Sequence, residues 1–152
     1  MALDSLGRIH FTDPCYGDRS QTAQFDSDGH EVEGVYRLDP NGSIQRIITY
    51  EVDRPNGIVV SPDGNWLFLA DNVNDGDRAL SGNRKLWRFN LDAAGRIVAG
   101  SREMLFDWGS DRGPDGLAIK TANQLYVAAG FNFGKPPIET TKIYRTDRLA
   151  SM

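Results

Sequence analysis

Two short Pro-X-Gly segments carry the residues of this chain whose types and spacing suit joint chemistry. Asn56 stands in a Pro-Asn-Gly segment eight residues before Gly64, and Asp115 stands in a Pro-Asp-Gly segment eight residues before Asn123. The shared offset predicts equivalent positions in a repeated unit. An amide oxygen and a carboxylate oxygen that converge suit a hard divalent cation such as Ca²⁺. The alternative is that each side chain makes only a local turn, as Asn and Asp commonly do.

The repeat that would bring the two residues together has a step of 58 residues, measured from Asp13 to Asp71 and from Asp71 to Ala129. Two sets of similar segments repeat along the chain. The first set is residues 7–13, 64–71 and 123–129, and the second is residues 35–39, 86–90 and 143–145. Steps of roughly 20–50 residues mark solenoids, propellers and arrays, and this step lies slightly above that range. Because the repeated segments are β-like, we expect a propeller.

The best-formed unit shows which elements would position the candidate site. Residues 58–60 are apolar and β-branched, a tight turn follows at 61–64, and residues 66–70 return as the second strand of a hairpin. Residues 85–89 alternate polar and apolar side chains, and a turn at 92–95 leads towards a fourth strand. Four antiparallel strands per unit are typical of a propeller blade.

We therefore predict an all-β fold, a single partial β-propeller domain over residues 1–152. Its four-stranded antiparallel blades would cover roughly 1–53, 54–112 and an incomplete 113–152. Dividing 152 residues by the step of 58 gives about 2.6 blades, whereas propellers typically close with 4–8. We expect a fragment of a longer protein, and the open blade edges favour self-association.

Composition excludes several classes of function. The net charge is −4 and no basic run is present, which argues against a nucleic-acid partner. No window approaches the roughly 20 apolar residues of a membrane helix, and residues 1–20 show no signal peptide. We expect a soluble protein, cytoplasmic or periplasmic. The single cysteine, Cys15, excludes an internal disulfide framework.

Other tempting motifs fail on spacing. Residues 71–76 resemble the start of an EF-hand loop, but Val73 occupies a ligand position and Gly82 stands where the bidentate Glu belongs. Residues 26–29 fail the same test and read as a solvated turn. No G-x-S-x-G nucleophile elbow occurs in the chain.

Five segments in order resemble the family of gluconolactonases, regucalcin (senescence marker protein) and related lactonohydrolases. They are Phe11–Gly17, Arg54–Ile58, Ser61–Gly64, Ala70–Asn72 and Pro114–Ala118. The resemblance implies a six-bladed propeller that binds one divalent metal in its channel and hydrolyses sugar lactones. In that family the metal is held by a Glu of the first blade, the Asn of Pro-Asn-Gly and the Asp of Pro-Asp-Gly. The last two match Asn56 and Asp115, whereas the Glu, and a further Asn of a Pro-Asn-Asp motif, are absent from this chain.

The same resemblance implies a gluconolactonase-like lactone hydrolase with a small sugar lactone as partner. Asp115 is the candidate general base as well as a metal ligand, and Asn56 is a metal ligand alone. Ca²⁺ is the favoured cation, with Zn²⁺, Mg²⁺ or Mn²⁺ as alternatives. Because the chain contains only half of the implied metal ligands, we expect the 152 residues alone to be inactive. Two other functions stay open: a non-catalytic six-bladed propeller used for binding, and a strictosidine-synthase-like propeller enzyme without this metal site.

Overall fold

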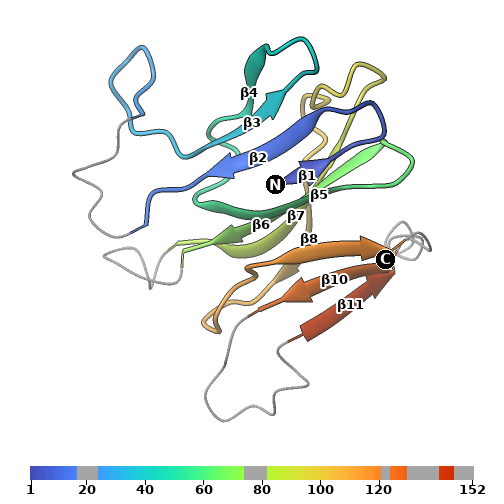
Figure 1. The fold of residues 1–152 in the computed structure, drawn as a ribbon. Coiled ribbons are helices and arrows are strands. Elements are labelled where there is room, and N and C mark those ends of the chain that lie inside the picture. The colour runs from blue at the N-terminus through green and yellow to red at the C-terminus, as the bar shows by residue number, and fades with distance from the viewer. Residues whose placement is uncertain (17–23, 74–81, 121–123, 130–140, 146–152) are drawn as a thin grey trace.

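Three antiparallel sheets follow one another along the chain in the computed structural model, which describes residues 1–16, 24–73, 82–120, 124–129 and 141–145 (Figure 1). The first sheet has the order β1-β2-β3-β4. Its strands are β1 (Ala2–Leu3), β2 (Ile9–Asp13), β3 (Gly34–Leu38) and β4 (Ile44–Ile48). The described residues contain no helix, and so none that could cross a membrane.

The second sheet is the complete blade that the sequence predicted, in the order β5-β6-β7-β8. Its strands are β5 (Pro55–Val60), β6 (Trp66–Asn72), β7 (Arg84–Asn90) and β8 (Glu103–Asp107). The hairpin turn between β5 and β6 closes with the Gly64 N–H donating to the Ser61 carbonyl at 2.9 Å. Gly64 has φ = +74°, a conformation that glycine adopts without steric cost.

The third sheet has the order β11-β10-β9, formed by β9 (Leu117–Lys120), β10 (Gln124–Ala128) and β11 (Thr141–Arg145). Together with the two four-stranded sheets it confirms the predicted all-β fold. The expected long loop after β6 falls largely on residues 74–81, which lie outside the described residues.

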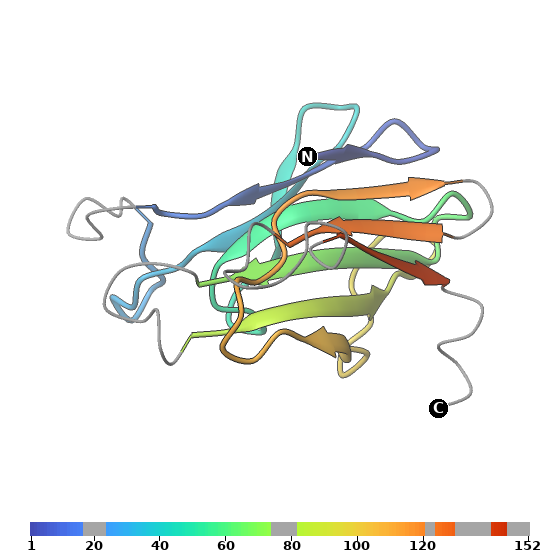
Figure 2. The same ribbon diagram turned by 90° about the horizontal axis from the view of Figure 1, so that it is seen from below.

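Strand β5 faces both of the other sheets, because it contacts β1 and β2 of the first sheet and β9 of the third (Figure 1, and turned by 90° in Figure 2). Two apolar clusters fill the spaces between the sheets. The first joins the first and second sheets through Val35, Ile48, Leu67, Leu69 and Phe89, and the second joins the second and third through Phe68, Leu86, Leu125 and Val127. Burying one large apolar side chain of this kind stabilises a fold by about 1.5–3 kcal/mol.

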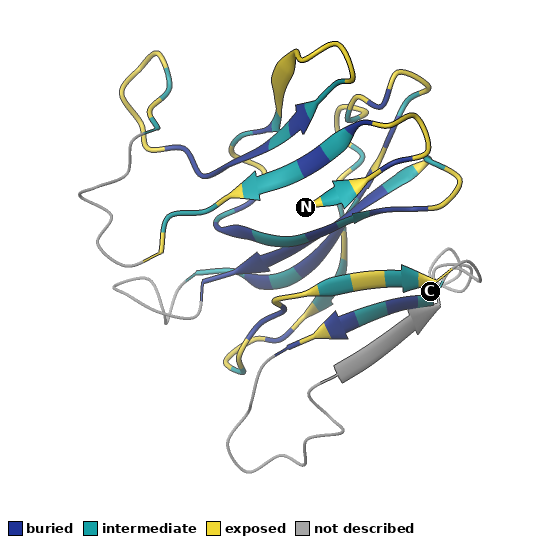
Figure 3. Ribbon diagram, in the orientation of Figure 1, coloured by how far each residue is buried: buried dark blue, intermediate teal, exposed yellow. Residues whose placement is uncertain are grey.

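Strand β6 explains how one sheet can pack on both of its faces. Successive side chains of a strand point to opposite faces, so Leu67 and Leu69 enter the first cluster while Phe68 enters the second. All three are fully buried. Figure 3 shows the contrast with β4, whose first three residues are exposed.

Polar contacts add a second link between the first two sheets. Arg37 Nη1 donates to the carbonyl oxygens of Ala94 and Gly95, at 3.0 and 2.8 Å, and Arg8 Nη1 reaches the same Ala94 oxygen at 2.5 Å. Gly95 has φ = +69°, a backbone conformation that side chains other than glycine rarely adopt, so this turn favours glycine. The turn between β7 and β8 is therefore held against the first sheet.

Candidate active site

Asp71 at the end of β6 fixes the chain that enters β5. Its buried carboxylate accepts hydrogen bonds from the backbone N–H groups of Asp53 and Arg54, at 3.1 and 2.8 Å, and from Trp87 Nε1 at 3.0 Å. Asn83 Nδ2 adds a further bond at 3.1 Å. Burial raises the pKa of Asp71, against the hydrogen bonds that lower it. Because both carboxylate oxygens of Asp71 accept hydrogen bonds, Asp71 fixes the backbone that precedes the Pro-Asn-Gly segment.

Asn56 lies where the pairing of β5 with β6 is irregular. Pro55 pairs with Asp71 and Ile58 pairs with Leu69, and the register shifts between the two pairs. Such irregularities re-aim side chains and are frequent beside active sites. The half-buried Asn56 accepts a 2.7 Å hydrogen bond at its carbonyl oxygen from Thr12 Oγ1.

Asp115 lies in the segment that leads into β9 and is exposed. Its backbone N–H donates to the Ala128 carbonyl at 2.7 Å, and the Ala128 N–H donates to the Gly116 carbonyl at 3.0 Å. These bonds tie the segment to the end of β10. Within the described part of the chain, the Asp115 carboxylate has no hydrogen bond or ion pair, so its oxygens are available to a ligand.

The two Pro-X-Gly segments lie against each other. A Cβ built on Gly57 would stand 2.1 Å from the Asp115 carbonyl oxygen and 3.0 Å from the Leu117 nitrogen, far inside normal contact. Only glycine fits this approach, so the Gly of Pro-Asn-Gly lets the backbone beside Asn56 touch the backbone of Asp115. The structure thus brings into contact the two segments that carry the predicted residues, while the roles of Asn56 and Asp115 as metal ligands and base stay predictions.

The chemical types of these two side chains suit a hard cation. The amide oxygen of Asn56 and the exposed carboxylate of Asp115 are both oxygen ligands, which Ca²⁺ prefers. They do not complete a coordination sphere of 6–8 oxygens. Waters and further ligands would have to supply the remaining positions.

A second group of residues at this end of β5 was not found from the sequence. The hydroxyl of Tyr16 accepts a hydrogen bond from Asn56 Nδ2. The Arg54 guanidinium lies over the Tyr16 ring, 5.3 Å from its centroid, and Arg54 Nε pairs with Glu33 Oε2 at 3.4 Å. Tyr16 follows a Pro-Cys pair after β2 and Glu33 precedes β3, but neither belongs to the repeat. Tyr16 and Arg54 do lie in two of the segments that carry the family resemblance, but nothing in the sequence indicated that they contact Asn56 and Glu33.

Asp26, Asp28 and His30 offer another set of metal-binding atoms, which lie within 4.8 Å of one another. They sit on a turn outside the site described above. Asp26 Oδ1 accepts the backbone N–H groups of Asp28 and His30, at 2.9 and 2.8 Å. Its Oδ2 contacts His30 Nδ1 at 3.1 Å. These bonds account for the group as a closed turn, as the sequence predicted for residues 26–29.

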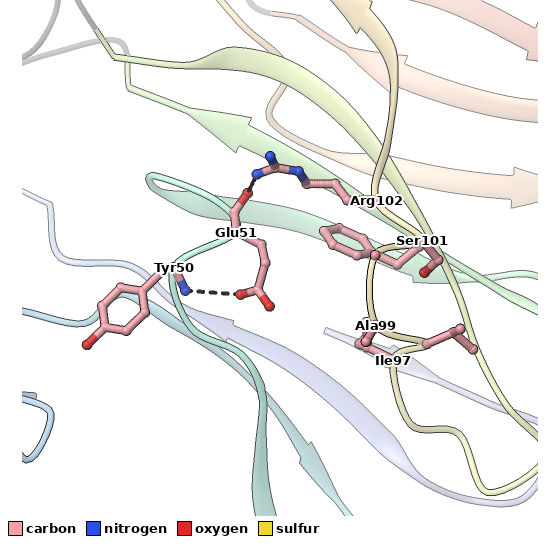
Figure 4. A pocket seen from close by; sticks show the side chains of 9 residues that line it. Tyr50, Glu51, Ile97, Ala99, Ser101 and Arg102 are labelled. Atoms are coloured by element: carbon pink, nitrogen blue, oxygen red, sulfur yellow. Dashed lines mark hydrogen bonds between the residues drawn. The ribbon is translucent and has the colours of Figure 1, made fainter.

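A cleft of about 420 Å³ contains neither Asn56 nor Asp115 (Figure 4). Phe89 and Ile97 contribute apolar walls, and Tyr50 lies at its rim. Arg102 donates from Nη1 to the Glu51 carbonyl oxygen within it. Its lining combines apolar walls with polar groups already bonded to one another, so it holds no constellation for catalysis.

Comparison with known proteins gives consistent results. Residues 1–143 match the model of the SMP-30/gluconolactonase/LRE-like region. A gluconolactonase of Zymomonas mobilis is 34% identical over 130 residues, which cover 81% of this chain and 33% of that protein. The chain thus spans about a third of the length of this curated relative.

Two solved structures share the fold. A gluconolactonase from Xanthomonas campestris superimposes with a TM-score of 0.66 at 24% identity, covering 95% of this chain and 42% of that one. A regucalcin from Agrobacterium tumefaciens, described as calcium-binding, superimposes with a TM-score of 0.53 at 23% identity, over 75% of this chain and 33% of that one.

Proposed function

Because this chain belongs to the SMP-30/gluconolactonase/LRE-like family, we propose that the protein hydrolyses sugar lactones with the help of a divalent cation bound at Asn56 and Asp115. The observation that carries the proposal is the contact between the two Pro-X-Gly segments at Gly57. The description of the Agrobacterium relative as calcium-binding supports Ca²⁺ as the cation.

The two candidate ligands would play different parts. Asn56 contributes a neutral oxygen, held in place through Thr12 and Tyr16. Asp115 contributes a negative charge and a proton acceptor, since its carboxylate is exposed and has no partner among the described residues. When bound, a divalent cation polarises a lactone carbonyl and lowers the pKa of a coordinated water.

Asp115 is the general base in this proposal. A base must lie within hydrogen-bond reach of the proton that it takes. A carboxylate at the cation meets this condition for the attacking water, which loses its proton to Asp115 as its oxygen adds to the lactone carbonyl. The ring C–O bond then breaks, the ring oxygen takes the proton held by Asp115, and the product is the open hydroxy acid with Asp115 again ionised.

Variants of a six-bladed protein that contains these residues test the assignment. Asp115→Asn should abolish turnover of glucono-1,5-lactone, because it removes a charged ligand and the base together. Asn56→Ala should mainly raise the cation concentration required, because it removes an oxygen and no proton acceptor. Acid release followed by pH, with and without a chelator, measures both effects. Undiminished turnover in Asp115→Asn would exclude Asp115 as the base, and activity indifferent to chelator would exclude the cation.

A further inference from the structure

We infer that Tyr16 is a positioning residue for Asn56, and that its hydroxyl holds the amide so that the amide oxygen is left for a cation. The inference rests on the proposed function, because it concerns the same cation site. It assigns a role to a residue outside the repeated Pro-X-Gly segments.

The contact between the two side chains sets the orientation of the amide. An Asn side chain has one oxygen acceptor and one NH₂ donor, and here the nitrogen of Asn56 points to the Tyr16 hydroxyl. The oxygen consequently lies on the other side of the amide carbon. If the amide rotated by half a turn, its NH₂ would replace the oxygen and could not bind a cation. A cation on the oxygen would also draw electron density from the nitrogen and strengthen its bond to Tyr16.

Tyr16 is itself held from two directions. Arg54 lies over its ring, and the preceding residue, Cys15, donates its backbone N–H to Glu33 Oε2 at 3.2 Å. The same carboxylate oxygen pairs with Arg54. The side chains of Arg54 and Glu33 are only 3% and 2% exposed, so the ion pair is a fixed support beneath a tyrosine that is half-exposed.

The backbone of Asn56 is held by the same segment of the first sheet. Thr12 Oγ1 donates to its carbonyl oxygen at 2.7 Å, four residues before Tyr16 in the chain. Both ends of Asn56, its backbone carbonyl and its side-chain nitrogen, are therefore bound from residues 12–16. The contact reaches across 40 residues of sequence and couples the first sheet to a ligand carried by the second.

A conservative substitution isolates the hydroxyl. Tyr16→Phe keeps the ring under Arg54 and removes the hydrogen-bond acceptor. Tyr50→Phe is the matched control, because Tyr50 is 60% exposed and its hydroxyl has no hydrogen bond in the described part of the chain. In the cation-free protein, ¹⁵N NMR should show the side-chain amide signals of Asn56 shifting in Tyr16→Phe and unchanged in Tyr50→Phe.

Ca²⁺ titration of the same variants then measures the coupling. Tyr16→Phe should weaken Ca²⁺ binding about fivefold, the effect of losing one hydrogen bond. In an Asn56→Ala background, Tyr16→Phe should cause no further loss, because residues that act through each other are not additive.

The outcomes separate this inference from the function on which it rests. If the side-chain amide signals of Asn56 do not shift in Tyr16→Phe, the role of Tyr16 is overturned. The same holds if Tyr16→Phe still weakens Ca²⁺ binding fivefold in the Asn56→Ala background. Both results would leave the cation site standing if Asn56→Ala by itself weakens Ca²⁺ binding. If Asn56→Ala leaves Ca²⁺ affinity unchanged, the cation site fails, and the role of Tyr16 fails with it.

Discussion

His10 on β2 is a fully buried histidine that contacts Asp4 through Nε2 at 3.0 Å. Burial lowers the pKa of His10, although the hydrogen bond to Asp4 opposes the shift, and the charges of Arg8 and Arg37 lower it further. Burial alone would raise the pKa of Asp4, but hydrogen bonds from His10 and Arg8 outweigh it and lower that pKa to about 2. The sequence showed no partner for His10, because Asp4 belongs to the turn after β1 and has no motif around it.

These shifts predict that acid destabilises this part of the fold. A histidine whose pKa is lowered on folding contributes stability above its ordinary pKa of 6.5 and loses it as the pH falls below that value. Asp4 contributes stability above its ordinary pKa of 3.8, which is lost as the pH falls towards 2. The urea midpoint of the wild type should therefore fall more between pH 7.5 and 5 than that of His10→Gln. A larger fall in the variant would contradict this assignment.

At the scale of elements, local patterns in the sequence predicted β2, β3, β5, β6, β7, β10 and β11, but they assigned no residues to β1, β4 or β8. The hairpin of β5 and β6 followed from a β-branched run, a Pro-Asp-Gly turn and a returning apolar run, which all depend on near neighbours. The start of β5 at Pro55 did not follow, because it depends on pairing with Asp71 across the sheet. The contacts of Tyr16 did not follow from the sequence for a similar reason: they join residues up to 40 positions apart and leave no periodic signal.

The contact between β5 and the segment before β9 should tolerate no side chain at Gly57. Gly57→Ala would place a Cβ 2.1 Å from the Asp115 carbonyl and push the two segments apart. We expect a loss of about 1–3 kcal/mol in the free energy of unfolding, as is typical of overpacking, together with weaker cation binding.

Gly116→Ala is the matched control for this substitution. A Cβ at Gly116 meets nothing within 4 Å, and the backbone there does not require a positive φ. Urea denaturation and Ca²⁺ titration of both variants give the comparison. Equal stability and equal affinity in the two would show that the close approach at Gly57 does not hold the site.

At the scale of the whole molecule, apolar side chains remain exposed on edge strands of the first sheet. Leu3 on β1 is 70% exposed and Ile44 on β4 is 61% exposed. Unpaired strand edges favour association, and we propose that the 152-residue chain self-associates through these edges. Leu3→Asp combined with Ile44→Asp should shift it towards a monomer in size-exclusion chromatography with light scattering. A wild type that elutes as a 16.9 kDa monomer at every concentration would refute the proposal.

The central claim is that Asn56 and Asp115 bind one divalent cation together, and paramagnetic NMR of the 152-residue chain with Mn²⁺ tests it most directly. Mn²⁺ broadens signals near its binding site, so the side-chain amide of Asn56 and the backbone amides of Asp115 and Gly116 should broaden first. Asp115→Asn should remove the effect, and excess Ca²⁺ should compete with it. Broadening confined to residues 26–30, where Asp26, Asp28 and His30 offer the rival set of ligand atoms, would contradict the claim.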